Sequence, residues 1–192
     1  TGGTAHSAAS PAVALPRDPL ERAYVAACVA ELEALKPGNV SMQAPGHDMT
    51  AADFIVSARV SAPHLCRGEA RLGGRVLAAI RATRDAVGCN TNLGIVLLCA
   101  PLVMAARRGE DGAPIERTIA SVLGELTVED TAAVFEAIRI AAPAGLGRQN
   151  EHDVHGPATA TLRAVMAAAA DRDHIARQYA QDFADVLGLG RT

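Results

Sequence analysis

The sequence CNTNLGIVLLCAPL occupies residues 89–102 and joins a polar cluster to a long apolar run. Asn90, Thr91 and Asn92 are residue types that commonly cap helices, and the apolar run continues from Leu93 to Ala106. A helix that is apolar on every side is typical of the interior of a protein. The run contains Pro101 and is too short to cross a bilayer, so we predict a core helix. Its amino end should open inside the protein or at the floor of a cleft.

The rest of the chain predicts helices packed around this one. Apolar residues recur every three or four positions, and no segment shows sustained alternation with a period of two. The 192 residues are 49% hydrophobic but only 3% aromatic, which favours closely packed helices. We therefore expect an all-α fold, a single compact bundle of about seven or eight helices whose polar loops form one cleft. The expected helices lie in residues 18–36, 50–65, 72–87, 93–106, 115–122, 127–142, 161–170 and 172–187.

Local signals place several helix ends. Asp18 precedes a helix that begins with Pro19, and Gly88 ends the third expected helix. Thr50 with Asp53, and Thr127 with Asp130, have the spacing of a capping box. We expect residues 1–17 to be a flexible tail and residues 18–192 to form one all-helical catalytic domain.

Charge and cysteine content restrict the class of partner. The formal net charge of -3 gives no electrostatic case for nucleic acid or for a membrane surface, so a small molecule or a protein is expected. The four cysteines show no CxxC spacing, which favours buried, reduced thiols in a cytoplasmic protein. We also expect a homodimer, because alanine-rich helices pack readily against copies of themselves.

The first of three polar loops contains Lys36, the only lysine among 18 basic residues. Asn39, His47 and Asp48 follow it, and two glycines permit close approach of the backbone to a ligand. A lysine is a compact cation suited to an anionic oxygen. The alternative is structural, because Lys36 would also stabilise the negative end of its own helix.

The second loop is the Asn90–Asn92 cluster in front of Gly94. Free amides at the start of a buried helix favour a phosphate or a carboxylate. Ordinary capping by Thr91 or Asn92 is the alternative, although it accounts for only one or two of these residues.

The third loop gathers Arg148, Glu151, His152, Asp153 and His155 within eight positions. Carboxylates could hold magnesium or act as a general base, and an arginine could bind phosphate. Zinc is disfavoured, because no HExxH pattern is present. A solvated charged loop is the structural alternative.

Several motifs, taken together, resemble the triphosphoribosyl-dephospho-CoA synthase family. They are LKPGNV (35–40), GHDMTAADF (46–54), VGCNTNLGIVLLCAPL (87–102), AIRIAAPAGLGRQNEHDV (137–154) and DRDHIARQYA (171–180). The likeness runs in consistent order from about Glu21 to Gly188. It implies an all-α transferase in which the 2'-hydroxyl of 3'-dephospho-CoA displaces adenine from C1' of the ATP ribose. The product is the precursor of a carrier-protein prosthetic group.

The resemblance also implies roles for the polar loops. Lys36 and Arg148 would bind the triphosphate, Asp48 and Glu151 would act as general base or bind Mg²⁺, and Asn90 would orient a ribose or phosphate. The candidate substrate- and phosphate-binding residues are Lys36, Asn39, Asn90, Thr91, Asn92, Gly94 and Arg148. The candidate catalytic residues are Asp48 and Glu151, and the candidate magnesium ligands are Asp48, Glu151 and Asp153.

Two features depart from the family pattern. Well-characterised branches carry a His-Lys pair after the Asn-Thr, where this chain has Asn92 and Leu93. Members also usually continue beyond the last helix expected here, with a further polar loop. By this resemblance the chain either lacks a C-terminal segment or belongs to a shorter, divergent branch with a different substrate. Two alternatives therefore stand beside transfer to dephospho-CoA. One is a divergent enzyme with another ribosyl or phosphate-bearing acceptor, or with water in its place, and the other is a nonenzymatic nucleotide- or carrier-protein-binding module.

Overall fold

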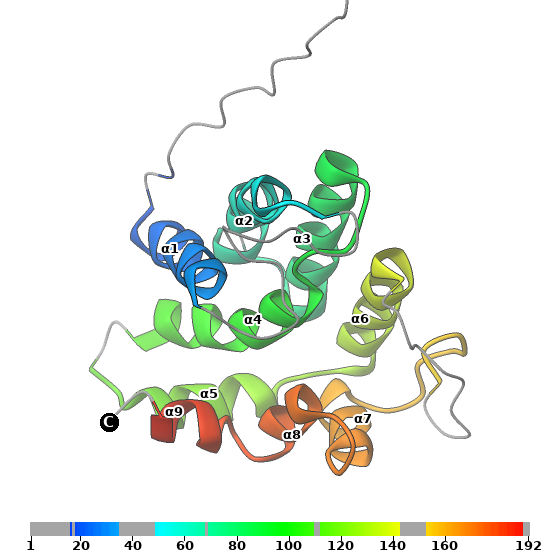
Figure 1. The fold of residues 1–192 in the computed structure, drawn as a ribbon. Coiled ribbons are helices and arrows are strands. Elements are labelled where there is room, and N and C mark those ends of the chain that lie inside the picture. The colour runs from blue at the N-terminus through cyan, green and yellow to red at the C-terminus, as the bar shows by residue number, and fades with distance from the viewer. Residues whose placement is uncertain are drawn as a thin grey trace, which may run out of the picture.

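The computed structural model describes residue 16 and residues 18–34, 49–67, 69–109, 112–142 and 153–189. Within these ranges the chain forms nine helices and no strand, so the all-α bundle predicted from the sequence is confirmed (Figure 1). The expected tail, residues 1–17, lies outside the described residues apart from Pro16.

The first two helices begin where their capping residues predict. α1 (Pro19–Glu33) starts after Asp18, whose carboxylate accepts a hydrogen bond from the amide of Leu20 at 2.9 Å. α2 (Ala51–Cys66) starts with a capping box in which Thr50 and Asp53 bond each other's backbone amides. α1 ends at Glu33, short of the predicted end at Lys36, because Ala34 already has an extended backbone.

α3 (Leu72–Val87) packs against α2 on one side and α6 (Val128–Ala141) on the other, and these are its most extensive contacts. It ends at Gly88, whose positive φ of 74° is the left-handed conformation that glycine adopts without strain. The chain then enters α4 (Leu93–Arg108), which contacts α1, α2, α3, α5 (Ile115–Gly124) and α8 (His174–Ala180). The predicted core helix is therefore confirmed.

The C-terminal third differs from the single helix expected over residues 172–187. After α7 (Leu162–Ala169), the chain forms α8 and α9 (Ala184–Leu189) with a break between them. Asp182 and Phe183 have φ values of 52° and 62°, which a right-handed helix cannot accommodate. The break turns the Phe183 side chain into the core, where it is fully buried with its ring centroid 5.6 Å from that of Tyr179.

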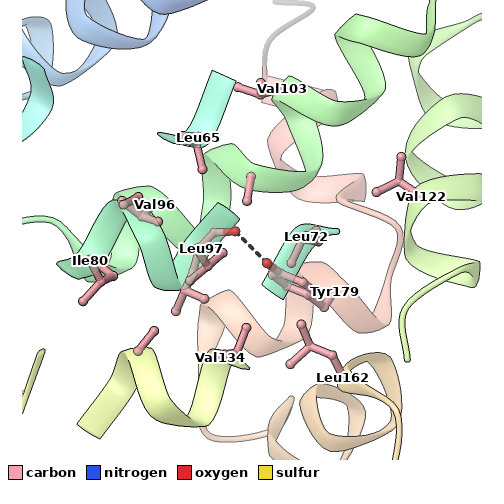
Figure 2. Close-up of a cluster of buried hydrophobic side chains, with 14 of the residues drawn as sticks. Leu65, Leu72, Ile80, Val96, Leu97, Val103, Val122, Val134, Leu162 and Tyr179 are labelled. Atoms are coloured by element: carbon pink, nitrogen blue, oxygen red, sulfur yellow. Dashed lines mark hydrogen bonds between the residues drawn. The ribbon is translucent and has the colours of Figure 1, made fainter. Parts of the chain in front are cut away.

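The hydrophobic core lies where α4 crosses the other helices (Figure 2). Val96 and Ala100 of α4 are fully buried in it. Tyr179 of α8 is also fully buried, and its hydroxyl donates a 2.7 Å hydrogen bond to the carbonyl oxygen of Leu97. This hydrogen bond fixes α8 against the amino-terminal half of α4.

Candidate functional site

The amino end of α4 is the part of the predicted site that the structure describes. The side chain of Asn90 accepts a hydrogen bond from the amide of Leu93 at 3.2 Å. Asn92 is the residue at the N-cap, but its side chain makes no capping bond. The amide of Val96 donates to the carbonyl oxygen of Asn92, whereas the amides of Gly94 and Ile95 have no hydrogen-bond partner among the described residues. Two unpaired amides therefore mark the positive end of a buried helix.

Thr91 and Asn92 turn their side chains toward the protein interior. Thr91 is 9% exposed and Asn92 is 5% exposed. The hydroxyl of Thr91 donates to Ser57 of α2 at 2.6 Å. The amide nitrogen of Asn92 donates to Ser61 of α2 at 3.3 Å and to Thr83 of α3 at 3.1 Å. These three hydrogen bonds tie the loop before α4 to α2 and α3.

The same hydrogen bonds extend to α1 through Ser61. The hydroxyl of Ser61 donates to the carbonyl oxygen of Ser57 at 2.6 Å, so the Tyr24 hydroxyl, 3.0 Å from Ser61, must donate to it. Burial raises the pKa of the Tyr24 phenol, so this donor keeps its proton at ordinary pH. We call the set Tyr24, Ser57, Ser61, Thr83, Thr91 and Asn92 the buried polar network.

One atom of the buried polar network is unpaired. Oδ1 of Asn92 is inaccessible to solvent and has no hydrogen-bond partner among the described residues. A buried carbonyl without a donor costs about 1–3 kcal/mol. In the side chain of Asn92, the amide nitrogen is therefore hydrogen-bonded and the carbonyl oxygen is not.

The residues from Asn90 to Ile95 have two different roles. The side chains of Thr91 and Asn92 position the loop, whereas the amides of Gly94 and Ile95, beside Asn90, are the groups that offer hydrogen bonds to a ligand. Gly94 itself lies against α8, because a Cβ at this position would come within 3.3 Å of Ile175 Cδ1. The assignment of Thr91 and Asn92 as phosphate ligands stays a prediction.

Asp153 and His155 are the members of the third loop that the structure describes. The carboxylate of Asp153 accepts a 2.8 Å hydrogen bond from the amide of His155, which closes a local turn. Arg139 of α6 donates to the carbonyl oxygen of Val154, so this end of the loop is held by α6. The described residues include no group of three His, Cys, Asp or Glu side chains that could hold a metal ion. The other predicted site residues, Lys36, Asn39, Asp48, Arg148 and Glu151, lie outside the described residues, as does most of the expected cleft.

The hydroxyl residues that support the loop were not among the site residues predicted from the sequence. Ser57 and Ser61 are four residues apart on the buried face of α2, and Thr83 occupies a position expected to be apolar. The available signal was a pair of serines at helical spacing on an otherwise apolar face. It indicates a polar partner inside the bundle but does not identify that partner.

Comparison with protein families shows which family the chain belongs to. The model of the CitG family, described as ATP:dephospho-CoA triphosphoribosyl transferase, matches residues 17–192. The chain belongs to this family. Comparisons with curated proteins and with solved structures gave no match. The family is one of transferases, and the enzyme class expected from the sequence is confirmed. Among the described residues of this family member, no helix has both the length and the apolar character needed to span a membrane.

Proposed function

We propose that this CitG family member transfers the 5-triphosphoribosyl group of ATP to the 2'-hydroxyl of 3'-dephospho-CoA and releases adenine. The family match over residues 17–192 is the observation that carries the proposal. The product would serve as a precursor of a prosthetic group or cofactor.

The amino end of α4 supports this proposal, because the substrate carries several phosphates. Two unpaired amides and the positive helix end favour an anionic group at Gly94 and Ile95. The buried polar network holds these amides in place before a ligand arrives, so little ordering is needed on binding. Asn90 would then orient a phosphate or a ribose hydroxyl beside them.

The reaction also requires a general base, a general acid and a binding site for the triphosphate. Substitution at an anomeric carbon passes through an oxocarbenium-like state, so the acceptor hydroxyl must lose a proton and the departing adenine must gain one. Asp48 or Glu151 would take the hydroxyl proton, and Lys36 and Arg148 would hold the triphosphate. These assignments follow from the family motifs in which the residues stand.

Magnesium is proposed to accompany ATP, with Asp48, Glu151 and Asp153 as the candidate ligands. Mg²⁺ bound to a nucleotide typically uses one or two carboxylates together with substrate phosphates. Asp153 is the one of the three that the structure describes, and its carboxylate accepts a hydrogen bond from the amide of His155.

One observation favours a different acceptor as the second candidate. Well-characterised branches of the family carry a histidine and a lysine where this chain has Asn92 and Leu93. Here Asn92 is buried and bonds to Ser61 and Thr83, so this position supplies no cation to a phosphate. The divergent enzyme would transfer the same group to another hydroxyl-bearing molecule.

The experiment is adenine release from ATP and Mg²⁺, measured by chromatography with and without dephospho-CoA. The proposal expects adenine that depends on dephospho-CoA, together with a coupled product that contains the triphosphoribosyl group. Lys36→Ala should reduce the rate by about 10²-fold or more, the size of effect seen when one preorganised donor is removed from a developing charge. Arg163→Gln removes an exposed arginine paired with Asp182 and serves as the control.

The other candidates give distinct products. Adenine with free ribose triphosphate would indicate hydrolysis, and adenine that appears only with another hydroxyl compound would indicate a divergent acceptor. No adenine under any of these conditions, from a protein with a normal helical circular dichroism spectrum, would overturn the proposal in favour of a binding module.

A further inference from the structure

The N-cap of α4 differs from the other polar N-caps in the described part of the chain. Five other described helices have Asp or Thr at the N-cap, with an extended backbone and a side chain that accepts a hydrogen bond from an amide of the first turn. Their ψ values lie between 118° and 179°, and the residues are Asp18, Thr50, Thr127, Thr161 and Asp173. Asn92 has a ψ of 13°, and its side chain makes no capping bond. Asparagine is among the most favoured N-cap residues, so the missing bond has a specific cause.

The missing bond leaves a donor and an acceptor unpaired close together. An N-cap side chain ordinarily accepts from the second or third amide of its helix. In α4 these are the amides of Gly94 and Ile95, which have no partner among the described residues. The acceptor would be Oδ1 of Asn92, which is inaccessible to solvent and also has no described partner. An extended backbone at Asn92 would let the two kinds of group pair with each other.

Contacts with α2 and α3 hold Asn92 away from this pairing. Its Nδ2 donates to the hydroxyl of Thr83 at 3.1 Å and to that of Ser61 at 3.3 Å. Both hydroxyl residues are buried, and Ser61 is itself fixed by its bonds with Tyr24 and with the Ser57 carbonyl. The carboxamide of Asn92 is therefore anchored through its nitrogen to two rigid helices, and the anchored side chain restrains the backbone at its ψ of 13°.

A capping side chain and an anion compete for the same donors, because both accept hydrogen bonds from the first-turn amides. If Asn92 capped α4, its Oδ1 would bond to Gly94 or Ile95, and a phosphate group would have to displace it. The observed conformation leaves these amides open, at the expense of an unpaired buried carbonyl. An unfavourable local conformation that is held by its surroundings is typical of functional sites.

We propose that Thr83 and Ser61 are positioning residues that keep the amino end of α4 open for a phosphate group, by holding Asn92 out of its capping conformation. The inference rests on the proposed function for the identity of the anion, which is the phosphate chain of ATP. The two hydroxyl groups act on the site through Asn92, to which both are bonded. Without them, Asn92 caps α4 as Asp18 caps α1, and the site is closed by its own side chain.

The test is binding of inorganic tripolyphosphate to the protein without nucleotide, measured by isothermal titration calorimetry at constant ionic strength. Thr83→Val keeps the shape of the side chain but removes the acceptor for Asn92. The affinity should fall about five-fold or more, the shift that an ordinary N-cap produces. Thr83→Ser keeps the hydroxyl and should bind like the wild type, as should the control Arg163→Gln, whose exposed ion pair with Asp182 lies in α7.

A double variant separates this role from simple support of the loop. Adding Asn92→Ala to Thr83→Val removes the competing cap, because alanine has no side-chain acceptor. Tripolyphosphate should therefore bind more tightly to the double variant than to Thr83→Val. If Thr83 only supported the loop, the second substitution would remove a further contact and weaken binding again. Circular dichroism checks that each variant is folded.

Hydrogen exchange reports the cap without any ligand. In ¹⁵N-labelled protein, the amide of Gly94 or Ile95 should exchange about five-fold more slowly in Thr83→Val than in the wild type, and the double variant should lose this protection. Faster exchange in Thr83→Val would indicate a loosened loop and would overturn the proposal. So would wild-type affinity of Thr83→Val for tripolyphosphate, no binding by the wild type, or a double variant that binds no better than Thr83→Val.

Adenine release, measured on the same proteins, separates this proposal from the transferase assignment. If the wild type releases adenine in the presence of dephospho-CoA but Thr83→Val binds tripolyphosphate normally, the positioning role alone fails. If the expected pattern of tripolyphosphate binding and exchange is found without adenine release, the transferase assignment alone fails.

Discussion

Two adjacent glycines in the first turn of α3 should respond to alanine in opposite directions. A Cβ at Gly73 would lie 2.6 Å from both the Cα and the carbonyl oxygen of Asp130 in α6. A Cβ at Gly74 would have the Ala70 Cβ as its nearest neighbour, at 3.6 Å, which is ordinary contact. The chemical change is the same, and the two positions lie in the same helix. The difference in stability therefore isolates the close approach of α3 to α6.

The cost at Gly73 can be worked from its contacts. Backbone atoms cannot rotate away, so α3 must move from α6, and overpacking of this kind costs about 1–3 kcal/mol. The movement also strains the 2.9 Å hydrogen bond from the Gly73 amide to the buried carboxylate of Asp130, and a bond of this type is worth about 1.5–3 kcal/mol. The higher helix propensity of alanine offsets about 1 kcal/mol of this destabilisation. The net expectation is a loss of roughly 3 kcal/mol, or about 6–12 °C in Tm.

For Gly74→Ala the change in helix propensity acts without a steric clash, so we expect the free energy of unfolding to rise by about 0.4–1 kcal/mol. Because the chain has no tryptophan, unfolding in urea is best followed by circular dichroism at the helical band. If Gly73→Ala is as stable as the wild type, or if both variants shift in the same direction, the close approach of α3 to Asp130 does not limit the side chain at position 73.

Three further predictions concern buried polar groups. Tyr179→Phe should lower the free energy of unfolding by about 1–3 kcal/mol, because the Leu97 carbonyl loses its donor; an unchanged urea midpoint would contradict this. Thr91→Val should destabilise by a similar amount while Thr91→Ser does not, because serine keeps the hydroxyl that bonds to Ser57; equal midpoints for the two variants would argue against the buried polar network. Burial raises the pKa of Cys28 to about 11 and that of Cys99 to about 12, so the folded chain retains thiol protons that the unfolded chain releases. The stability that these protonated thiols contribute is complete below about pH 8.5 and falls as the pH rises toward 12, so a flat profile of urea midpoint against pH would exclude this effect.

The sequence predicts the elements that depend on local chemistry. Asp18, Thr50 and Thr127 cap helices because a short polar side chain reaches an amide two or three residues ahead, whatever the rest of the fold does. Gly88 ends α3 for an equally local reason. The core helix α4 follows from an apolar run that has no stable alternative to burial.

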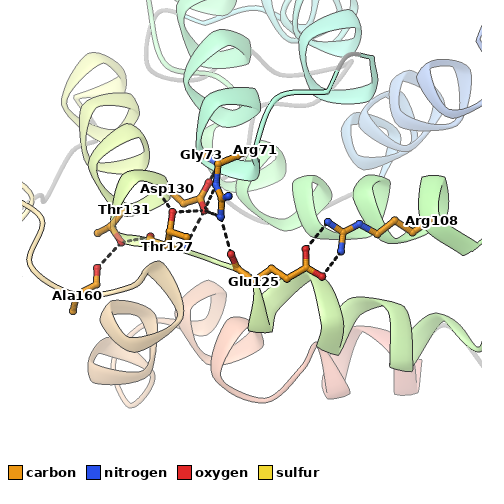
Figure 3. A network of polar contacts seen from close by, with 8 residues as sticks. All are labelled: Arg71, Gly73, Arg108, Glu125, Thr127, Asp130, Thr131 and Ala160. Carbon is orange, nitrogen blue, oxygen red and sulfur yellow. Dashed lines mark hydrogen bonds and ion pairs between the residues drawn. The ribbon is translucent and has the colours of Figure 1, made fainter.

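Features that depend on distant contacts could not be predicted in this way. The break at Asp182 and Phe183 contains neither glycine nor proline, and it is stabilised by the burial of the Phe183 ring in the core. Asp130 was recognised as a cap of its own helix, but its second bond, to Gly73, joins residues 57 positions apart. The ion pairs of Arg71 with Asp130 and of Arg108 with Glu125 join residues from the ends of different helices, which no local pattern connects (Figure 3).

The two ends of α4 are satisfied in different ways. At the amino end, the amides of Gly94 and Ile95 have no hydrogen-bond partner among the described residues. At the carboxyl end, Arg107 pairs with Asp18 and Arg108 pairs with Glu125, and both cations complement the negative end of the helix dipole. The carboxyl end is therefore fixed by side chains to the start of α1 and the end of α5, whereas the amino end keeps donors that a ligand could use.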